Sequence, residues 1–210
     1  MREIVQFSVD QCMASGTAAW VLILPGYVYL TDSANPVEAE SVNQTQVLSK
    51  QLVLRRAGDP DVESLAGMLG GMPDFSLYMR FQTAIGKPPR PALLQQLVCP
   101  NGAAWVAERD REVVGHAMWA WVDGTGVPTV ELALIVAEAE QRRGLGVRML
   151  TEAARDALAA GAAQFVVMVS AMNDQVLRMV RRRWPTATTN REGALLNFTI
   201  PAADFLAAMN

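Results

Sequence analysis

The sequence predicts an α/β protein, more specifically an α+β fold with a mixed, mostly antiparallel central sheet flanked by helices and an N-terminal β-hairpin appendage. Three observations support this class. Strand-like runs separated by tight turns fill residues 104–136, an apolar strand leads through a glycine-containing loop into an amphipathic helix at 141–160, and a further strand and helix follow within 165–183. Tight turns pair strands antiparallel, and the intervening helices supply the covering layers.

Composition limits the possible functions. The chain has 210 residues, 51% of them apolar and 19% charged, which is enough to bury one full core. With a net charge of -3, the chain lacks the overall positive charge that favours binding to nucleic acid. Cys12, Cys99 and the single His116 cannot form a zinc-binding set, so we expect no metal. No signal or transit peptide pattern is evident, and the apolar stretch 18–30 is broken by Pro25-Gly26. We therefore expect a cytoplasmic protein without a membrane partner.

Residues 1–50 differ in character from the rest of the chain. Two short apolar runs, 20–24 and 27–30, flank Pro25-Gly26 and predict a hairpin, and a polar stretch follows at 31–50. We predict that 1–50 form an appendage with a polar linker and that 51–210 form the main domain. The appendage is expected to extend the sheet, cover an edge strand or mediate a homodimer, and covering an edge is favoured.

The main domain divides into elements through its periodicity and turn signals. After a strand at 52–55, Asp59 and Pro60 are typical of a helix start, and Leu65, Met68 and Leu69 form an apolar stripe. The remaining elements are expected as a short helix within 73–85, a helix at 92–98, strands at 104–108, 113–122 and 129–136, a helix at 145–160, a strand at 165–169, a helix at 173–183, two strands about Glu192-Gly193 that end with 195–200, and a terminal helix near 202–208.

The most informative segment is Gln141-Arg142-Arg143-Gly144-Leu145-Gly146. It opens a helix whose first backbone N–H groups lack intrahelical partners, and glycines allow an anion to approach the backbone. No Lys-Ser or Lys-Thr follows as in a Walker loop, and the spacing is not G-x-G-x-x-G. The loop therefore indicates a diphosphate cradle for a ligand that is neither a nucleoside triphosphate nor NAD.

The order of elements and this loop resemble the GNAT superfamily of acyl-CoA-dependent N-acyltransferases. The loop matches the Q/R-x-x-G-x-G/A motif, which in that family holds the pyrophosphate of acetyl-CoA. Asn173 opens a segment that resembles the family's N-x-x-(A/M)-L motif. The segments 75–81 and 129–133 resemble the S-x-x-x-R-F and A-E-x-A segments of the bacterial Pat-type protein-lysine acetyltransferase branch. The resemblance covers about residues 51–200.

The resemblance implies a set of site residues. Glu131 corresponds to the general base, and a backbone N–H near Ile135 or Val136 would stabilise the oxyanion where two strands splay apart. Contacts to acetyl-CoA are implied for these residues: Leu134, Ile135, Val136, Gln141, Arg142, Arg143, Gly144, Leu145, Gly146, Val147 and Asn173. Many members carry a tyrosine that protonates the leaving thiolate, but the corresponding position here is about Val180.

Each of these assignments has a simpler structural alternative. Glu131 is either a buried base or a strand residue that points to solvent or pairs with an arginine. Arg142 and Arg143 either neutralise the diphosphate or are solvated, and His116 between Val114 and Met118 is expected to be packed. Tyr78 and Arg80 either shape an acceptor site or fix their helix to the sheet.

Three functions remain open at this point. The first is acetyl-CoA-dependent N-acetylation of a protein lysine, motivated by segment 75–81 and Glu131. The second keeps the reaction but takes a small amine, such as a polyamine, an amino acid or an aminoglycoside. The third is a non-catalytic acyl-CoA-binding module, motivated by the missing tyrosine.

Overall fold

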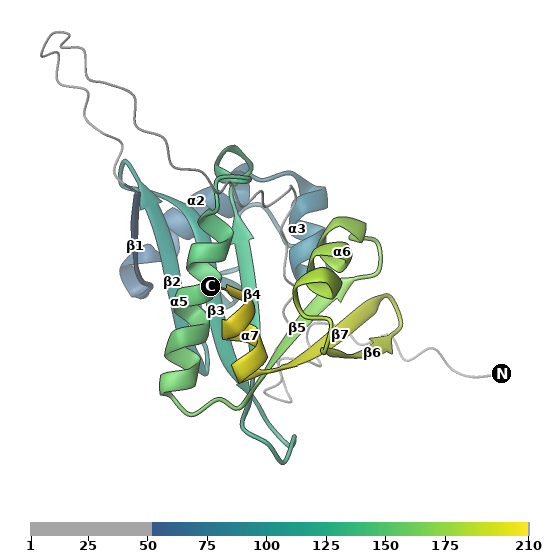
Figure 1. Cartoon of the computed structure of the whole chain (residues 1–210). Helices are drawn as coiled ribbons and strands as arrows, with labels where there is room; N and C mark the ends of the chain where they lie inside the picture. Colours follow the sequence, from purple (N-terminus) through teal and green to yellow (C-terminus); the bar gives the residue numbers. More distant parts are fainter. Residues whose placement is uncertain (1–51, 210) are drawn as a thin grey trace, which may run out of the picture.

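A seven-stranded sheet organises the computed structural model, which describes residues 52–209 (Figure 1). The strand order is β1-β2-β3-β4-β5-β7-β6. The strands are β1 Leu52–Arg56, β2 Gly102–Arg109, β3 Glu112–Val122, β4 Thr129–Val136, β5 Gln164–Ser170, β6 Thr188–Glu192 and β7 Leu195–Pro201. The α-helices are α2 Val62–Gly71, α3 Asp74–Phe81, α4 Pro91–Val98, α5 Leu145–Ala159, α6 Asp174–Arg183 and α7 Ala202–Met209, with 3-10 turns η1 Asp59–Asp61 and η2 Glu138–Glu140.

The sheet is antiparallel except at its centre, which confirms the predicted fold class. β1 to β4 form a meander, and β7 pairs antiparallel with both β5 and β6. Asp110 and Arg111 close the β2–β3 turn with φ values of 53° and 69°, as a tight hairpin requires. Only β4 and β5 run parallel, because α5 carries the chain back to the start of the sheet between them.

The β4–β5 ladder is short. It contains Thr129↔Gln164, Val130↔Phe165 and Glu131↔Val166 and no further pair. Beyond it, β4 continues to pair with β3 as far as Val136, and β5 continues to pair with β7 as far as Ser170. Figure 1 shows the two strands diverging from this point. The sheet therefore opens between its two central strands.

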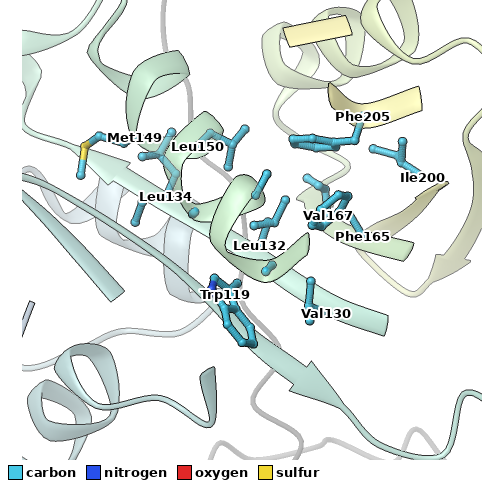
Figure 2. Packing of buried hydrophobic residues seen from close by; sticks show 14 of the residues in the cluster. Trp119, Val130, Leu132, Leu134, Met149, Leu150, Phe165, Val167, Ile200 and Phe205 are labelled. Carbon is cyan, nitrogen blue, oxygen red and sulfur yellow. The ribbon is translucent and has the colours of Figure 1, made fainter. Parts of the chain in front are cut away.

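Alternating side chains of β4 reach two separate cores. Val130, Leu132, Leu134 and Val136 belong to the cluster formed with α5, α6 and α7, whereas Ala133 and Ile135 belong to the cluster formed with α2, α3 and α4. Figure 2 shows Leu132 and Leu134 of the first cluster among residues of α5, β5 and α7. This two-residue alternation is what a central strand covered on both faces requires.

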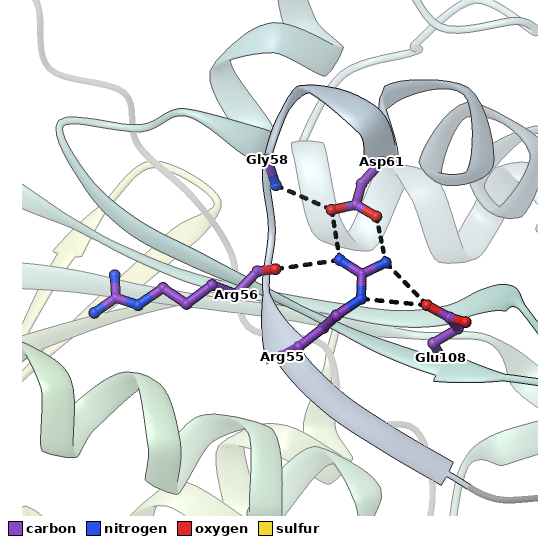
Figure 3. Close-up of polar contacts among 5 residues, drawn as sticks. All are labelled: Arg55, Arg56, Gly58, Asp61 and Glu108. Carbon is purple, nitrogen blue, oxygen red and sulfur yellow. Dashed lines mark hydrogen bonds and ion pairs between the residues drawn. The ribbon is translucent and has the colours of Figure 1, made fainter.

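The first helix begins differently from the prediction. Asp59 and Pro60 lie in η1, whose N-cap is Gly58, and Asp59 does not cap α2. Asp61 instead accepts the Gly58 N–H at 3.0 Å and two hydrogen bonds from the Arg55 guanidinium at 2.7 and 2.9 Å (Figure 3). Asp61 is the N-cap residue of α2, but its carboxylate makes no capping hydrogen bond to that helix and binds Gly58 and Arg55 instead.

The other predicted elements are found within a few residues of their expected bounds. The short helix expected within 73–85 covers Asp74–Phe81, and the helix expected from Asn173 begins at Asp174 with Asn173 as its N-cap. The predicted N-terminal hairpin lies outside the described residues. Within residues 52–209, none of the helices is both long and apolar enough to traverse a bilayer.

Asp61→Asn is expected to lower the free energy of unfolding at pH 7 by about 1–2 kcal/mol, because it breaks a charge-assisted pair with the partly exposed Arg55. The Arg55 hydrogen bonds hold the pKa of Asp61 below its usual value. A lowered carboxyl pKa gives stability above the unfolded-state value near 3.8, and that stability is lost as the pH falls. Urea unfolding from pH 7 to pH 3 should therefore show the two proteins converging at acidic pH.

The matched control is Asp123→Asn, which removes an exposed carboxylate from the β3–β4 turn. Its stability should stay close to that of the wild type at every pH. A constant difference between wild type and Asp61→Asn across the pH range would contradict the role assigned to the ion pair.

Candidate active site

Glu131 lies where the central strands part. It is the last β4 residue paired with β5, opposite Val166, and its side chain is 6% exposed. Because β4 lies between β3 and β5, Glu131 is not on an edge strand, and it shares its face with Ala133 and Ile135. The structure therefore places Glu131 as a buried carboxylate at the base of the opening rather than on the solvent side.

Arg80 supplies a positive charge on the same side of the sheet. It lies in the last turn of α3, is 0% exposed, and follows Leu77, which packs in the same cluster as Ala133 and Ile135. Burial lowers the pKa of Arg80 to about 9, and the negative charge of Glu131 opposes that shift. The guanidinium therefore remains protonated at neutral pH and places a positive charge near Glu131.

His116 is a packed, neutral histidine, as the sequence indicated. It is 0% exposed on β3, and its Nε2 lies 2.9 Å from the Leu97 carbonyl oxygen. Burial and the nearby charge of Arg80 lower its pKa to about 4. At neutral pH the ring is therefore uncharged, and Nε2 carries the proton that it donates to the Leu97 carbonyl.

The glycine loop folds back onto the end of β4. Gln141 Nε2 donates to the Val136 carbonyl at 2.8 Å, and Arg142 and Gly144 adopt positive φ values of 63° and 75°. Gly144 is the N-cap of α5 and has no side chain with which to cap it. The first turn of α5 therefore directs its N–H groups toward the loop, which is the geometry of an anion site.

The arginines of this loop are accessible. Arg142 and Arg143 are exposed, whereas Leu145 and Gly146 are buried at the start of α5 and Val147 is half-buried. The loop is also connected to α3, because Ser76 donates to the Glu138 carboxylate in η2 at 3.0 Å. Ser76 and Arg80 lie four residues apart on the buried face of α3, so one helix contacts both the loop and the Glu131 region.

The strand residues and Asn173 complete the predicted set. Leu134, Ile135 and Val136 lie on the part of β4 that has left β5, with Ile135 on the opposite face from the other two. The Asn173 side-chain Oδ1 accepts the Val176 N–H at 3.2 Å and caps α6 at the far side of the opening, just after β5. The predicted cofactor residues thus lie on the part of β4 that has left β5, in the loop and first turn of α5, and at the start of α6.

Comparison with known proteins identifies the family. The model of the acetyltransferase (GNAT) family matches residues 75–183, which is just over half of the chain. The chain belongs to the GNAT acetyltransferase family. Family membership indicates acetyl-CoA-dependent N-acetylation. A comparison with curated proteins finds no match.

Solved structures share the GNAT fold. The GNAT domain of S. lividans PAT is 20% identical, with a TM-score of 0.60 over 70% of this chain and 89% of that one. The protein yncA from Salmonella typhimurium, solved with its cofactor acetyl-CoA, is 18% identical, with a TM-score of 0.55 over 72% and 94%. A spermidine N-acetyltransferase chimera from Vibrio cholerae and human sequences is 13% identical, with a TM-score of 0.55 over 74% and 98%. At these identities the likeness extends to the fold alone.

The chain departs from the GNAT pattern at the position where many members carry a tyrosine, and the structure shows that the residue found there is buried. Val180 occupies the position at which many members carry tyrosine, and its side chain is 0% exposed in the core on the α6 side. Arg178, Arg181 and Arg182 are exposed on α6, and burial lowers the pKa of Arg183. The helix therefore offers no hydroxyl group to the opening.

Sequence reasoning missed the interactions that connect elements distant in the chain. Ser76 and Arg80 were visible as part of a family segment, but their partners Glu138 and Glu131 lie more than fifty residues later. The available signal was their four-residue spacing, which places a serine and an arginine on the buried face of one helix. A buried arginine requires an acid, and Glu131 is the buried acid on the adjacent strand.

Gly144→Ala is expected to lower the free energy of unfolding by about 1–2 kcal/mol, because the φ value of 75° is unfavourable for a residue with a Cβ atom. No steric clash contributes, since no described atom lies within 4 Å of the added methyl group. Urea denaturation of the purified variant measures the effect.

The control for this prediction is Gly70→Ala, which adds the same methyl group in α2. This glycine has ordinary helical geometry and also has open space around its Cβ position. The control should be more stable than the wild type by about 0.5–1 kcal/mol. Two variants that change stability in the same direction would contradict the conformational explanation.

Proposed function

We propose that this chain is an acetyl-CoA-dependent N-acetyltransferase in which Glu131 is the general base and the acceptor is the side-chain amine of a protein lysine. The observation that carries the proposal is the position of Glu131, buried at the last β4–β5 pair, with the charge of Arg80 near it. A carboxylate at this point is next to the strand segment that the family uses for the thioester.

The proposed cofactor site consists of the opened strands and the glycine loop. The backbone of 134–136 would pair with the pantetheine arm, and the N–H groups of Leu145, Gly146 and Val147 would bind the diphosphate. Arg142 and Arg143 are exposed beside it, and an exposed guanidinium is free to form charge-assisted hydrogen bonds with phosphate oxygens. The Asn173 side-chain NH₂ group, which its capping bond does not use, is placed at the opposite side.

The proposed chemistry assigns one step to each group. Glu131 accepts a proton from the lysine ammonium, so that a neutral amine can attack the thioester carbonyl. A backbone N–H near Ile135 or Val136 stabilises the oxyanion, since this part of β4 has no β5 partner. The attacking nitrogen gives its second proton to water. The thiolate leaves without a tyrosine proton donor, which its ordinary pKa of about 8.5 permits, and takes a proton from water.

Two features support a protein acceptor. Segment 75–81, which resembles the Pat-type branch, forms α3, and this helix presents Phe75 and Tyr78 outward with exposures of 64% and 43%. Exposed aromatic side chains suit contact with a polypeptide better than contact with a small polycation. The GNAT domain of S. lividans PAT is among the proteins with the same fold.

Glu131→Gln is expected to lower kcat by about 100-fold or more at neutral pH, because glutamine cannot accept the ammonium proton. Binding of acetyl-CoA, measured by isothermal titration calorimetry, should stay unchanged, and the acidic limb of the pH–rate profile should disappear. Glu112→Gln, which changes an exposed carboxylate on β3, is the matched control. An unaltered pH–rate profile in Glu131→Gln would rule out the base assignment.

The acceptor class is tested by comparing lysine-containing peptides with spermidine, amino acids and an aminoglycoside under saturating acetyl-CoA. We expect kcat/KM for the best peptide to exceed that for spermidine by about tenfold or more, since discrimination arises from transition-state contacts. Higher activity on a small amine would support the alternative acceptor. Cofactor binding without transfer to any amine would support a non-catalytic module.

A further inference from the structure

Two acidic residues of η2, Glu138 and Glu140, directly precede the glycine loop. Negative charge at this position should repel a diphosphate. Each carboxylate interacts with a different residue. Glu138 accepts a hydrogen bond from the Ser76 hydroxyl on α3, and Glu140 forms an ion pair with Arg109 at the end of β2. The loop therefore depends on partners that lie far from it in the sequence.

The Arg109–Glu140 pair is two-pronged and shielded from solvent. Arg109 Nε lies 2.9 Å from Glu140 Oε1, and Arg109 Nη2 donates to Oε2 at 3.0 Å. The side chains are 22% and 9% exposed. Arg109 therefore contacts both oxygens of the Glu140 carboxylate, through one charge-assisted hydrogen bond from Nη2 and a close ion-pair contact from Nε.

Glu140 also lies near a loop arginine. Arg143 Nη1 is 3.6 Å from Glu140 Oε2, and the Arg143 side chain is 63% exposed. Among the described residues, Arg109 and Arg143 are the cations near Glu140, and Arg109 has the shorter contacts. Glu140 therefore competes with any bound phosphate for Arg143, and Arg109 reduces this competition by neutralising Glu140.

We propose that Arg109 is a positioning residue for the cofactor: by holding Glu140, it leaves Arg143 available to the diphosphate of acetyl-CoA. This inference rests on the proposed cofactor site. Without Arg109 the buried Glu140 carboxylate needs another cation, because an uncompensated buried charge is costly. Arg143 is the nearest, so it turns inward and is lost to the ligand.

The test is acetyl-CoA affinity of the full chain, measured by calorimetry without an acceptor. Arg109→Gln should weaken binding by about tenfold, the scale expected for the loss of a charge-assisted phosphate contact. Arg143→Gln should weaken binding similarly in the wild type and have little further effect in Arg109→Gln. Arg111→Gln, which removes an exposed arginine from the same turn, should bind as the wild type does.

Glu140→Gln separates this role from a purely structural one. If Arg109 only braces the loop, breaking the pair from either side should weaken binding equally. If Arg109 acts by neutralising the charge of Glu140, Glu140→Gln should bind acetyl-CoA at least as tightly as the wild type. The double variant Arg109→Gln/Glu140→Gln should then recover most of the affinity that Arg109→Gln loses. Equal losses in the two single variants, or no loss in Arg143→Gln, would overturn the proposal.

Folding and the underlying assignment are checked separately. Circular dichroism establishes that each variant is folded, and Arg109→Lys, which retains the charge but not the two-pronged geometry, replaces Arg109→Gln if that variant does not fold. Arg109→Lys should then give an intermediate affinity. A wild-type chain that does not bind acetyl-CoA would contradict the proposed function, whereas normal binding by both Arg109 variants would contradict this inference alone.

Discussion

The early end of the β4–β5 ladder is the constraint on which the rest of the molecule depends. After Glu131 and Val166 each strand keeps one hydrogen-bonded neighbour instead of two. Backbone groups along the opening then need partners from elsewhere, since buried N–H and C=O groups are rarely left unpaired. An extended ligand that lies between the strands can supply them. The opening thus gives a central strand the binding capacity of an edge strand while covering both of its faces.

Packing explains how the sheet opens without coming apart. At the end of the sheet where β4 and β5 are paired, the ring centroids of Phe165 in β5 and Phe205 in α7 lie 4.7 Å apart. The Phe205 ring stacks on the Trp184 ring with a centroid distance of 4.6 Å. These rings pack at the start of β5, where it pairs with β4, and Figure 2 shows the Phe165 and Phe205 side chains close to one another. Farther along, α5 packs on the β2–β4 side while β5 follows β7. Beyond the last β4–β5 pair, each half of the sheet is therefore packed or paired with its own neighbouring elements.

Features that depend on neighbouring residues were predictable from the sequence, whereas contacts between distant segments were not. Element bounds were predictable because caps, turns and periodicity act over a few residues, as at Asp110-Arg111 and along α5. The prediction that Asp59 caps the helix was wrong, because Gly58 is the N-cap of η1 and the carboxylate that binds its N–H is that of Asp61, which also pairs with Arg55 of β1. The burial of Glu131 and the pairings of Arg80 and Arg109 depend on contacts between distant segments, which periodicity does not encode. The roles of the predicted site residues therefore stay predictions, and their electrostatic environment was not predictable from the sequence.

The two buried glutamates near the opening share one electrostatic arrangement. Glu131 has the charge of Arg80 from α3 near it, and Glu140 is bound by Arg109 from β2. A buried charge is costly unless an opposite charge lies close to it, and each glutamate has an arginine nearby. Their proposed roles differ: we propose that Glu131 accepts a proton from the acceptor amine, whereas Arg109 balances the charge of Glu140 so that an anion can bind nearby. An arginine from a distant segment thus lies near each buried acid, one acid within β4 and the other just beyond its end.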